Sequence, residues 1–195
     1  TYYGESSPYG TDIPLAACGI VMKTNAILLA FIIGISQGSQ PIIGFNYGAK
    51  QYDRVRKTYK LAISVNLAIS AVGFILFQFF PRLIISLFGT GDEMYFTFAV
   101  KFMRIFLFMI IANGVQLISS NFFSAIGKPV KGLLLSMTRQ VFFLIPLILI
   151  LPLFFGLDGI MFAGPVADSA AFVTTVILIV QEMRHMRGLE KAAVS

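Results

Sequence analysis

Long apolar stretches dominate this sequence of 195 residues and decide what it can fold into. Five of them reach roughly the 20 residues that an α-helix needs to cross the hydrocarbon core of a bilayer. They cover approximately residues 13–36, 61–80, 95–124, 133–155 and 159–181. Turn-forming residues separate them in GFNYGAKQYD, FGTGDE, AIGKPVKG and FGLDG. The sequence therefore predicts an all-α, multipass transmembrane helix bundle with five spans.

The composition excludes several other classes of protein. Hydrophobic residues make up 57% of the chain and charged residues 12%, about half the charged fraction of a soluble domain. A single cysteine excludes a disulfide framework and a metal site built from cysteines. The one histidine, His185, lies in a polar tail without a nucleophile to pair with. Gly44 and Gly48 do not fit a phosphate-binding loop. We therefore expect no enzyme and no organic cofactor.

Basic residues favour one side of the predicted membrane. The connections after the first and third spans and the C-terminal tail carry nearly all of them, whereas the other connections carry mainly acidic residues and Arg82. Because cytoplasmic connections are enriched in lysine and arginine, we expect the N-terminus outside and the C-terminus in the cytoplasm. The net charge is +6, and the basic residues that produce it lie between apolar runs. This pattern indicates contact with membrane lipid and not with nucleic acid.

The segment at the end of the first span is unusual. Pro41 cannot donate a backbone hydrogen bond, which predicts that the helix kinks or ends there, and Gly38 and Gly44 permit close approach of a neighbouring helix. The string GISQGSQPIIGFNYGAKQYDRV resembles the signature of the multidrug and toxic compound extrusion (MATE) family. LFGTGDEM, SAIGKPVKG, SMTRQVFFLIP and GPVADSAAF are similar to later segments of that family, in the same order. On this resemblance the motif residues with a structural role are Gly38, Gln40, Pro41, Gly44, Asn46, Gly48 and Pro165.

The resemblance implies a place in a larger protein. Family members have twelve transmembrane helices in two lobes around a cavity that opens alternately to each side. Residues 1–195 then form a partial C-terminal lobe, helices 8 to 12, which lacks the N-terminal lobe and helix 7. The implied function is part of a multidrug antiporter of the plasma membrane, which exports small amphiphilic, often cationic drugs in exchange for Na⁺ or H⁺. Because alternating access needs two bundles, we expect this polypeptide alone to be inactive.

Polar side chains inside the spans are the candidates for lining a cavity, because their burial in a bilayer is costly. They are Lys23, Asn25, Asn113, Gln116, Arg139 and Asp168. Asp168 either binds a cation or substrate, or hydrogen-bonds a neighbouring helix. Arg139 either extends to the cytoplasmic face or pairs with a carboxylate on another helix. The amides, together with Asn121, either line the cavity or join helices.

Two further expectations concern substrate and coupling. Phe102, Phe106, Phe142 and Phe143 are candidates to face an apolar substrate, whereas Lys101 and Arg104 are expected to extend toward the outer surface. The span 95–124 contains no acidic residue, which departs from the NorM-type branch of the family, and the acids of the DinF-type branch would lie in the missing lobe. The coupling ion and any metal site therefore stay open. The alternatives are a flippase for lipid-linked saccharides, which would need a cationic cavity, and a membrane scaffold without transport activity.

Overall fold

The computed structural model describes residues 12–89 and 91–192, and every regular element in these ranges is a helix. The elements are α2 (Asp12–Gly48), α3 (Tyr52–Phe79), α4 (Pro81–Ser86), α5 (Glu93–Phe106), α6 (Ile110–Ala125), α7 (Pro129–Met137), the π-helix η1 (Thr138–Leu144) and α8 (Ile145–Ala192). Four helical segments are long and apolar enough to cross a membrane, and the bent pair α5–α6 makes a fifth. This arrangement confirms the predicted all-α bundle of membrane-spanning helices.

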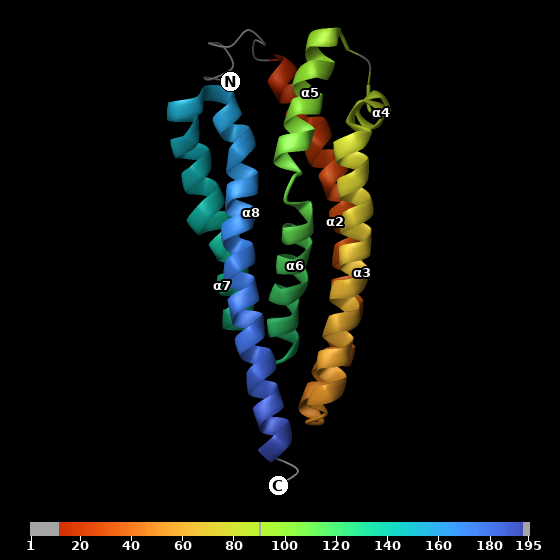
Figure 1. The fold of residues 1–195 in the computed structure, drawn as a ribbon, viewed down its shortest axis with the longest axis vertical. Helices are drawn as coiled ribbons and strands as arrows, with labels where there is room; N and C mark the ends of the chain where they lie inside the picture. Colours follow the sequence, from red (N-terminus) through yellow and green to blue (C-terminus); the bar gives the residue numbers. More distant parts are fainter. Residues whose placement is uncertain (1–11, 90, 193–195) are drawn as a thin grey trace.

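The helices run alternately up and down the bundle (Figure 1). In Figure 1, α2 descends, α3 rises, α5 and α6 descend, α7 rises through η1 into the first part of α8, and the rest of α8 descends. The helix α8 reverses at Gly156, whose φ of 56° lies in the left-handed region that glycine adopts without strain. The connections rich in basic residues thus gather at one end of the bundle, as the sequence predicts. Which side of the membrane this end faces stays a prediction.

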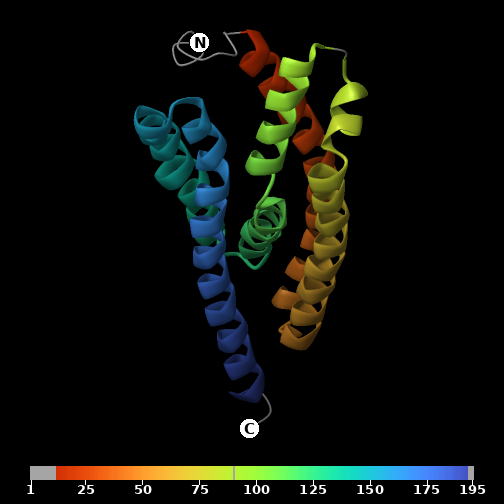
Figure 2. The same ribbon diagram turned by 45° about the horizontal axis from the view of Figure 1, so that its top comes forward.

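The pair α5–α6 lies in the middle of the molecule, between α2–α3 on one side and α7–α8 on the other (Figure 2). More than half of α6 is buried, and its buried residues include Asn113, Gln116, Ser119 and Ser120. Large apolar side chains such as Phe45, Phe79 and Phe154 are instead exposed on the outer helices. The bundle therefore buries polar groups beside two apolar core clusters and exposes large apolar groups on its surface, which suits a lipid environment.

The structure extends one predicted span and bends another. The helix α2 passes through Pro41 and continues to Gly48, so of the two outcomes predicted at this proline the helix end is wrong; membrane helices tolerate a proline in their interior. The predicted span 95–124 agrees in extent with Glu93–Ala125, but it consists of two helices, since α5 and α6 meet at a bend of 46°. At the bend, Phe108 N donates to Ile105 O (3.2 Å), which leaves the carbonyl of Arg104 without its α-helical donor.

Gln78 of α3 compensates for this break. Its Nε2 donates to the backbone oxygen of Arg104 at 2.8 Å. A backbone carbonyl that faces lipid finds no water, so a side chain from a neighbouring helix is one of the few donors that can satisfy it. The bend is thus stabilised by a residue distant in sequence, and nothing in the apolar string FLFMII signals it.

Candidate functional site

The polar centre of the bundle is built around α6. Gln116 Nε2 donates to Leu135 O on α7 at 2.7 Å, and Asn121 Nδ2 donates to Ser36 Oγ on α2 at 2.8 Å. These two amides therefore point to different helices and join them, in agreement with the second of the two predicted roles. Asn113 is also buried, with 8% of its surface exposed.

Several buried polar residues of this centre are absent from the sequence-based candidates. Tyr59 on α3 shares a hydrogen bond of 2.8 Å with Ser119, and Ser120 Oγ donates to the backbone oxygen of Gly132 at 2.6 Å. Asn66 is fully buried and lies so close to Gly114 that a Cβ at that glycine would stand 2.4 Å from Asn66 Oδ1. The sequence gives little signal for them, because Asn66, Ser119 and Ser120 lie in stretches that read as ordinary apolar spans and Tyr59 lies in the basic segment before residue 61.

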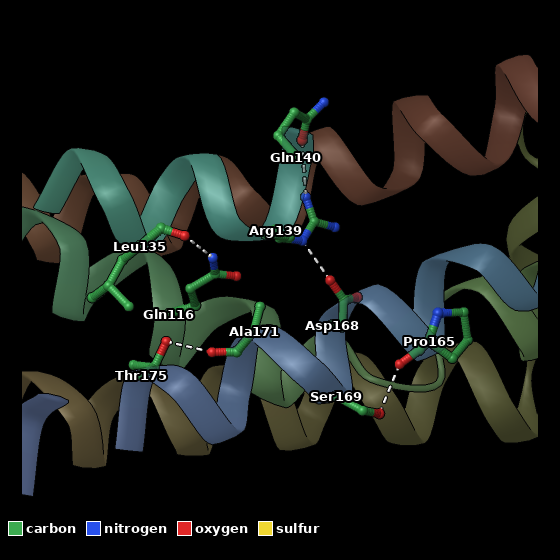
Figure 3. A network of polar contacts seen from close by, with 9 residues as sticks. All are labelled: Gln116, Leu135, Arg139, Gln140, Pro165, Asp168, Ser169, Ala171 and Thr175. Carbon is green, nitrogen blue, oxygen red and sulfur yellow. Dashed lines mark hydrogen bonds and ion pairs between the residues drawn. The ribbon is translucent and has the colours of Figure 1, made fainter. Parts of the chain in front are cut away.

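The last two crossings of the bundle contain a buried ion pair (Figure 3). Arg139 Nε donates to Asp168 Oδ1, and the two side chains are 20% and 5% exposed. Arg139 thus pairs with a carboxylate across helices, which was one of its two predicted alternatives. Asp168 hydrogen-bonds a neighbouring helix, which leaves its predicted role toward a cation or substrate untested.

Local backbone features surround this ion pair. Arg139 lies in η1, one π-helical stretch that ends just before Pro146, and π-helical turns occur often at functional sites. Pro165 lies one turn before Asp168 in α8, where the proline removes a backbone hydrogen bond, and Ser169 Oγ donates to the Pro165 oxygen at 2.7 Å. Both partners of the pair therefore sit on segments whose helical hydrogen bonding is irregular. Such segments change shape more readily than a regular helix does.

The remaining candidates lie apart from this pair. Lys23 is exposed on α2 and forms no ion pair with a described residue. Asn25 is half-buried, and its Oδ1 accepts no hydrogen bond from the described part of the chain. Phe102 and Phe106 belong to an apolar core cluster, so the prediction that they face a substrate is wrong for this chain. Phe142 is 61% exposed and Phe143 is half-buried.

The motif residues near Pro41 lie in the last turns of α2. Asn46 Nδ2 donates to Ile42 O at 2.7 Å, and Gly48 is the last residue of α2. A Cβ at Gly44 would lie 3.2 Å from Ala125 O at the end of α6, so this glycine permits the predicted close approach. A Cβ at Gly38 would meet no described atom within 4 Å, and that glycine has no such contact here. Gln40 is half-buried and Pro41 is exposed.

Ion pairs at the same end hold α8 against its neighbours. Glu182 is 2% exposed and accepts hydrogen bonds from Lys128 and from Lys131, the latter at 3.2 Å. Arg56 of α3 pairs with Glu190 of α8 at 2.7 Å. These contacts join α8 to the α6–α7 turn and to the start of α3. Sequence reasoning assigned the basic residues to a cytoplasmic surface and did not detect Glu182 as their buried partner.

Comparison with known proteins shows to which family this chain belongs. The MatE family model matches residues 7–150, well over half of the chain. The chain belongs to the MATE family. Its sequence is 25% identical over 186 residues to the multidrug export protein MepA of Staphylococcus haemolyticus (strain JCSC1435), a match that covers 95% of this chain and 40% of MepA.

Solved MATE structures resemble the chain as well. The MATE multidrug transporter DinF-BH, solved as a complex with a ligand, is 39% identical, with a TM-score of 0.78 over 84% of this chain and 36% of DinF-BH. An outward-facing multidrug resistance MATE family transporter shares the fold at a TM-score of 0.84 and 14% identity, over 96% of this chain and 42% of the transporter. The chain thus spans about two fifths of the length of these MATE proteins, and it is a multipass membrane protein of a transporter family.

Proposed function

We propose that this chain is part of the C-terminal lobe, helices 8 to 12, of a cation-coupled multidrug antiporter. The whole protein would export amphiphilic, often cationic compounds from the cytoplasm by alternating access in exchange for Na⁺ or H⁺. Membership of the MATE family supports the proposal, as do the multidrug export function in the name of MepA and the description of DinF-BH as a multidrug transporter. The N-terminal lobe and helix 7 would complete the cavity, so the chain alone would not transport.

The observation that carries the mechanism is the buried ion pair between Arg139 and Asp168. A carboxylate in the membrane interior needs a counter-charge, and Arg139 supplies it here. A proton, a sodium ion or a cationic substrate that reached Asp168 would replace that counter-charge. Arg139 would then be released from α8, and the irregular turn of η1 would absorb the movement. Occupancy of Asp168 would in this way be coupled to the contact between the last two crossings.

Efflux of a fluorescent cationic dye tests this role in the full-length protein that contains the chain. Cells expressing Asp168→Asn or Arg139→Ala would be loaded with dye, and efflux would be followed under imposed Na⁺ and pH gradients. We expect both variants to lose most of the gradient-dependent efflux at equal expression. The matched controls are Asp53→Asn and Arg54→Ala, which change an acid and a base at the exposed start of α3. If both core variants exported dye as well as the controls do, the ion pair would be purely structural.

A further inference from the structure

Two adjoining grooves lie on the exposed side of α5. The first, of about 680 Å³, lies between α5 and the segment where α3 meets α4, and its walls include Phe80, Arg82 and Lys101. The second, of about 470 Å³, continues from α5 along α8 from Phe162 to Ser169, on the segment that also carries Asp168. Arg104 and Ile105 line both, so the two grooves form one continuous surface.

The first groove carries an uncompensated positive charge. Arg82 pairs with both oxygens of Glu93 at 3.0 and 2.6 Å, and Lys101 pairs with Asp158 at 2.6 Å. Arg104 is exposed, and no described acidic residue forms an ion pair with it. It lies three residues after Lys101, on the same face of α5. The planar guanidinium of an arginine matches a phosphate or carboxylate with two parallel hydrogen bonds.

The position of Arg104 along the bundle matches the depth of a lipid headgroup. Its backbone oxygen accepts a hydrogen bond from Gln78, so the two residues lie at the same level. Gln78 is near the end of the apolar stretch 61–80, which at 1.5 Å per residue spans about 30 Å, the thickness of the hydrocarbon core. Arg104 therefore lies close to the boundary of the hydrocarbon core, at the end of the bundle where α4 is found. Its side chain is long enough to reach the phosphate layer.

The second groove supplies the complementary apolar surface. Below Arg104 its walls are formed by Phe108, Met109, Phe162 and Val166, toward the middle of the membrane. An anionic amphiphile has a charged headgroup and an apolar chain. A cationic group at the core boundary would bind the headgroup, and the apolar groove next to it would hold the chain. We infer that this surface binds an anionic membrane phospholipid, with the phosphate on Arg104 and one acyl chain along the second groove. This site is independent of the transport proposed above.

Photolabelling of the full-length protein tests the site. The protein would be reconstituted in phosphatidylcholine nanodiscs with a trace of phosphatidylglycerol that carries a diazirine in its acyl chain. A parallel sample would contain phosphatidylcholine with the same chain. We expect the phosphatidylglycerol probe to label the segments around residues 105–109 and 162–166, several-fold more than the phosphatidylcholine probe does. Arg104→Gln should lower this labelling about tenfold, the loss of one charge-assisted contact, whereas Arg54→Gln, at an exposed arginine of the opposite end, should not.

Three results would overturn the inference. They are equal labelling by both headgroups, labelling in Arg104→Gln that matches the parent, and labelling of these segments by a decyl phosphate that carries a diazirine in its chain but not by the phosphatidylglycerol probe. The last result would assign the groove to a free anionic amphiphile. Unlabelled phosphatidylglycerol provides a check that requires no variant, because it should displace the probe while phosphatidylcholine should not. Dye efflux plays no part in these readouts, so a failure of the transport proposal would remain distinguishable.

Discussion

The ion pair between Arg139 and Asp168 makes a quantitative prediction for stability. With exposed fractions of 20% and 5%, neither charge has much access to water. Insertion scales give about 3 kcal/mol for a charge at the centre of a membrane helix, and removal of one partner of a buried ion pair costs about 3–5 kcal/mol. Arg139→Gln should therefore lower the free energy of unfolding by about 3 kcal/mol because it leaves Asp168 without a counter-charge. Asp168→Asn should have a similar effect.

The double variant separates the ion pair from two independent defects. Once one charge is lost, the second substitution removes the orphaned charge that causes the loss, so the double variant should lose less than either single variant and far less than about 6 kcal/mol. The resulting coupling energy is larger than about 3 kcal/mol, measurable by SDS titration of the full-length protein in mixed micelles with circular dichroism. The pair Asp53–Lys57, with side chains 48% and 75% exposed, is the matched control and should show no measurable coupling, because water screens it. Additive losses within about 0.5 kcal/mol at the buried pair would refute the reasoning.

Three further predictions concern helix packing and are checked in the same titration. Gly132→Ala should destabilise by about 1–3 kcal/mol because its Cβ would stand 2.5 Å from a backbone oxygen of α6. Gly188→Ala would meet no atom of the described residues within 4 Å and should be neutral or slightly stabilising. Glu182→Gln should cost about 3 kcal/mol because a buried carboxylate with two lysine partners is neutralised, whereas Glu190→Gln, at a side chain 39% exposed, should cost less than about 1 kcal/mol. Tyr59→Phe should cost about 1 kcal/mol for its lost hydrogen bond to α6. If the two glycine variants were equally stable, or the two glutamate variants were, the contact assigned to Gly132 or to Glu182 would be wrong. A Tyr59→Phe variant as stable as the parent would contradict its hydrogen bond to α6.

The number and type of the membrane-spanning elements could be predicted from the sequence, whereas several of their ends could not. An apolar window of about 20 residues detects the part of a helix that lies in lipid, but α2 extends over 37 residues. The bend between α5 and α6 contains neither glycine nor proline. It depends on the hydrogen bond that Gln78 donates from α3, and a contact between helices leaves no local pattern.

The same limit applies to the candidate site. Arg139 and Asp168 stood out because charges are rare in apolar stretches, yet nothing in the sequence showed that they pair with each other across 29 positions. Glu182 escaped detection because it lies in a polar tail, where burial by lysines from another turn is invisible locally. Residue type and membrane depth thus reveal which side chains are costly to bury. Only the packing of the helices shows what satisfies them.

Gradient-dependent dye efflux by the full-length protein tests the central claim most directly. Cells loaded with a fluorescent cationic dye would receive an inward Na⁺ gradient or an inward H⁺ gradient separately, with membrane expression verified. The account predicts efflux that depends on one of these gradients, which would identify the coupling ion, and no efflux from cells that express residues 1–195 alone. Verified expression without efflux under either gradient would contradict the multidrug antiporter.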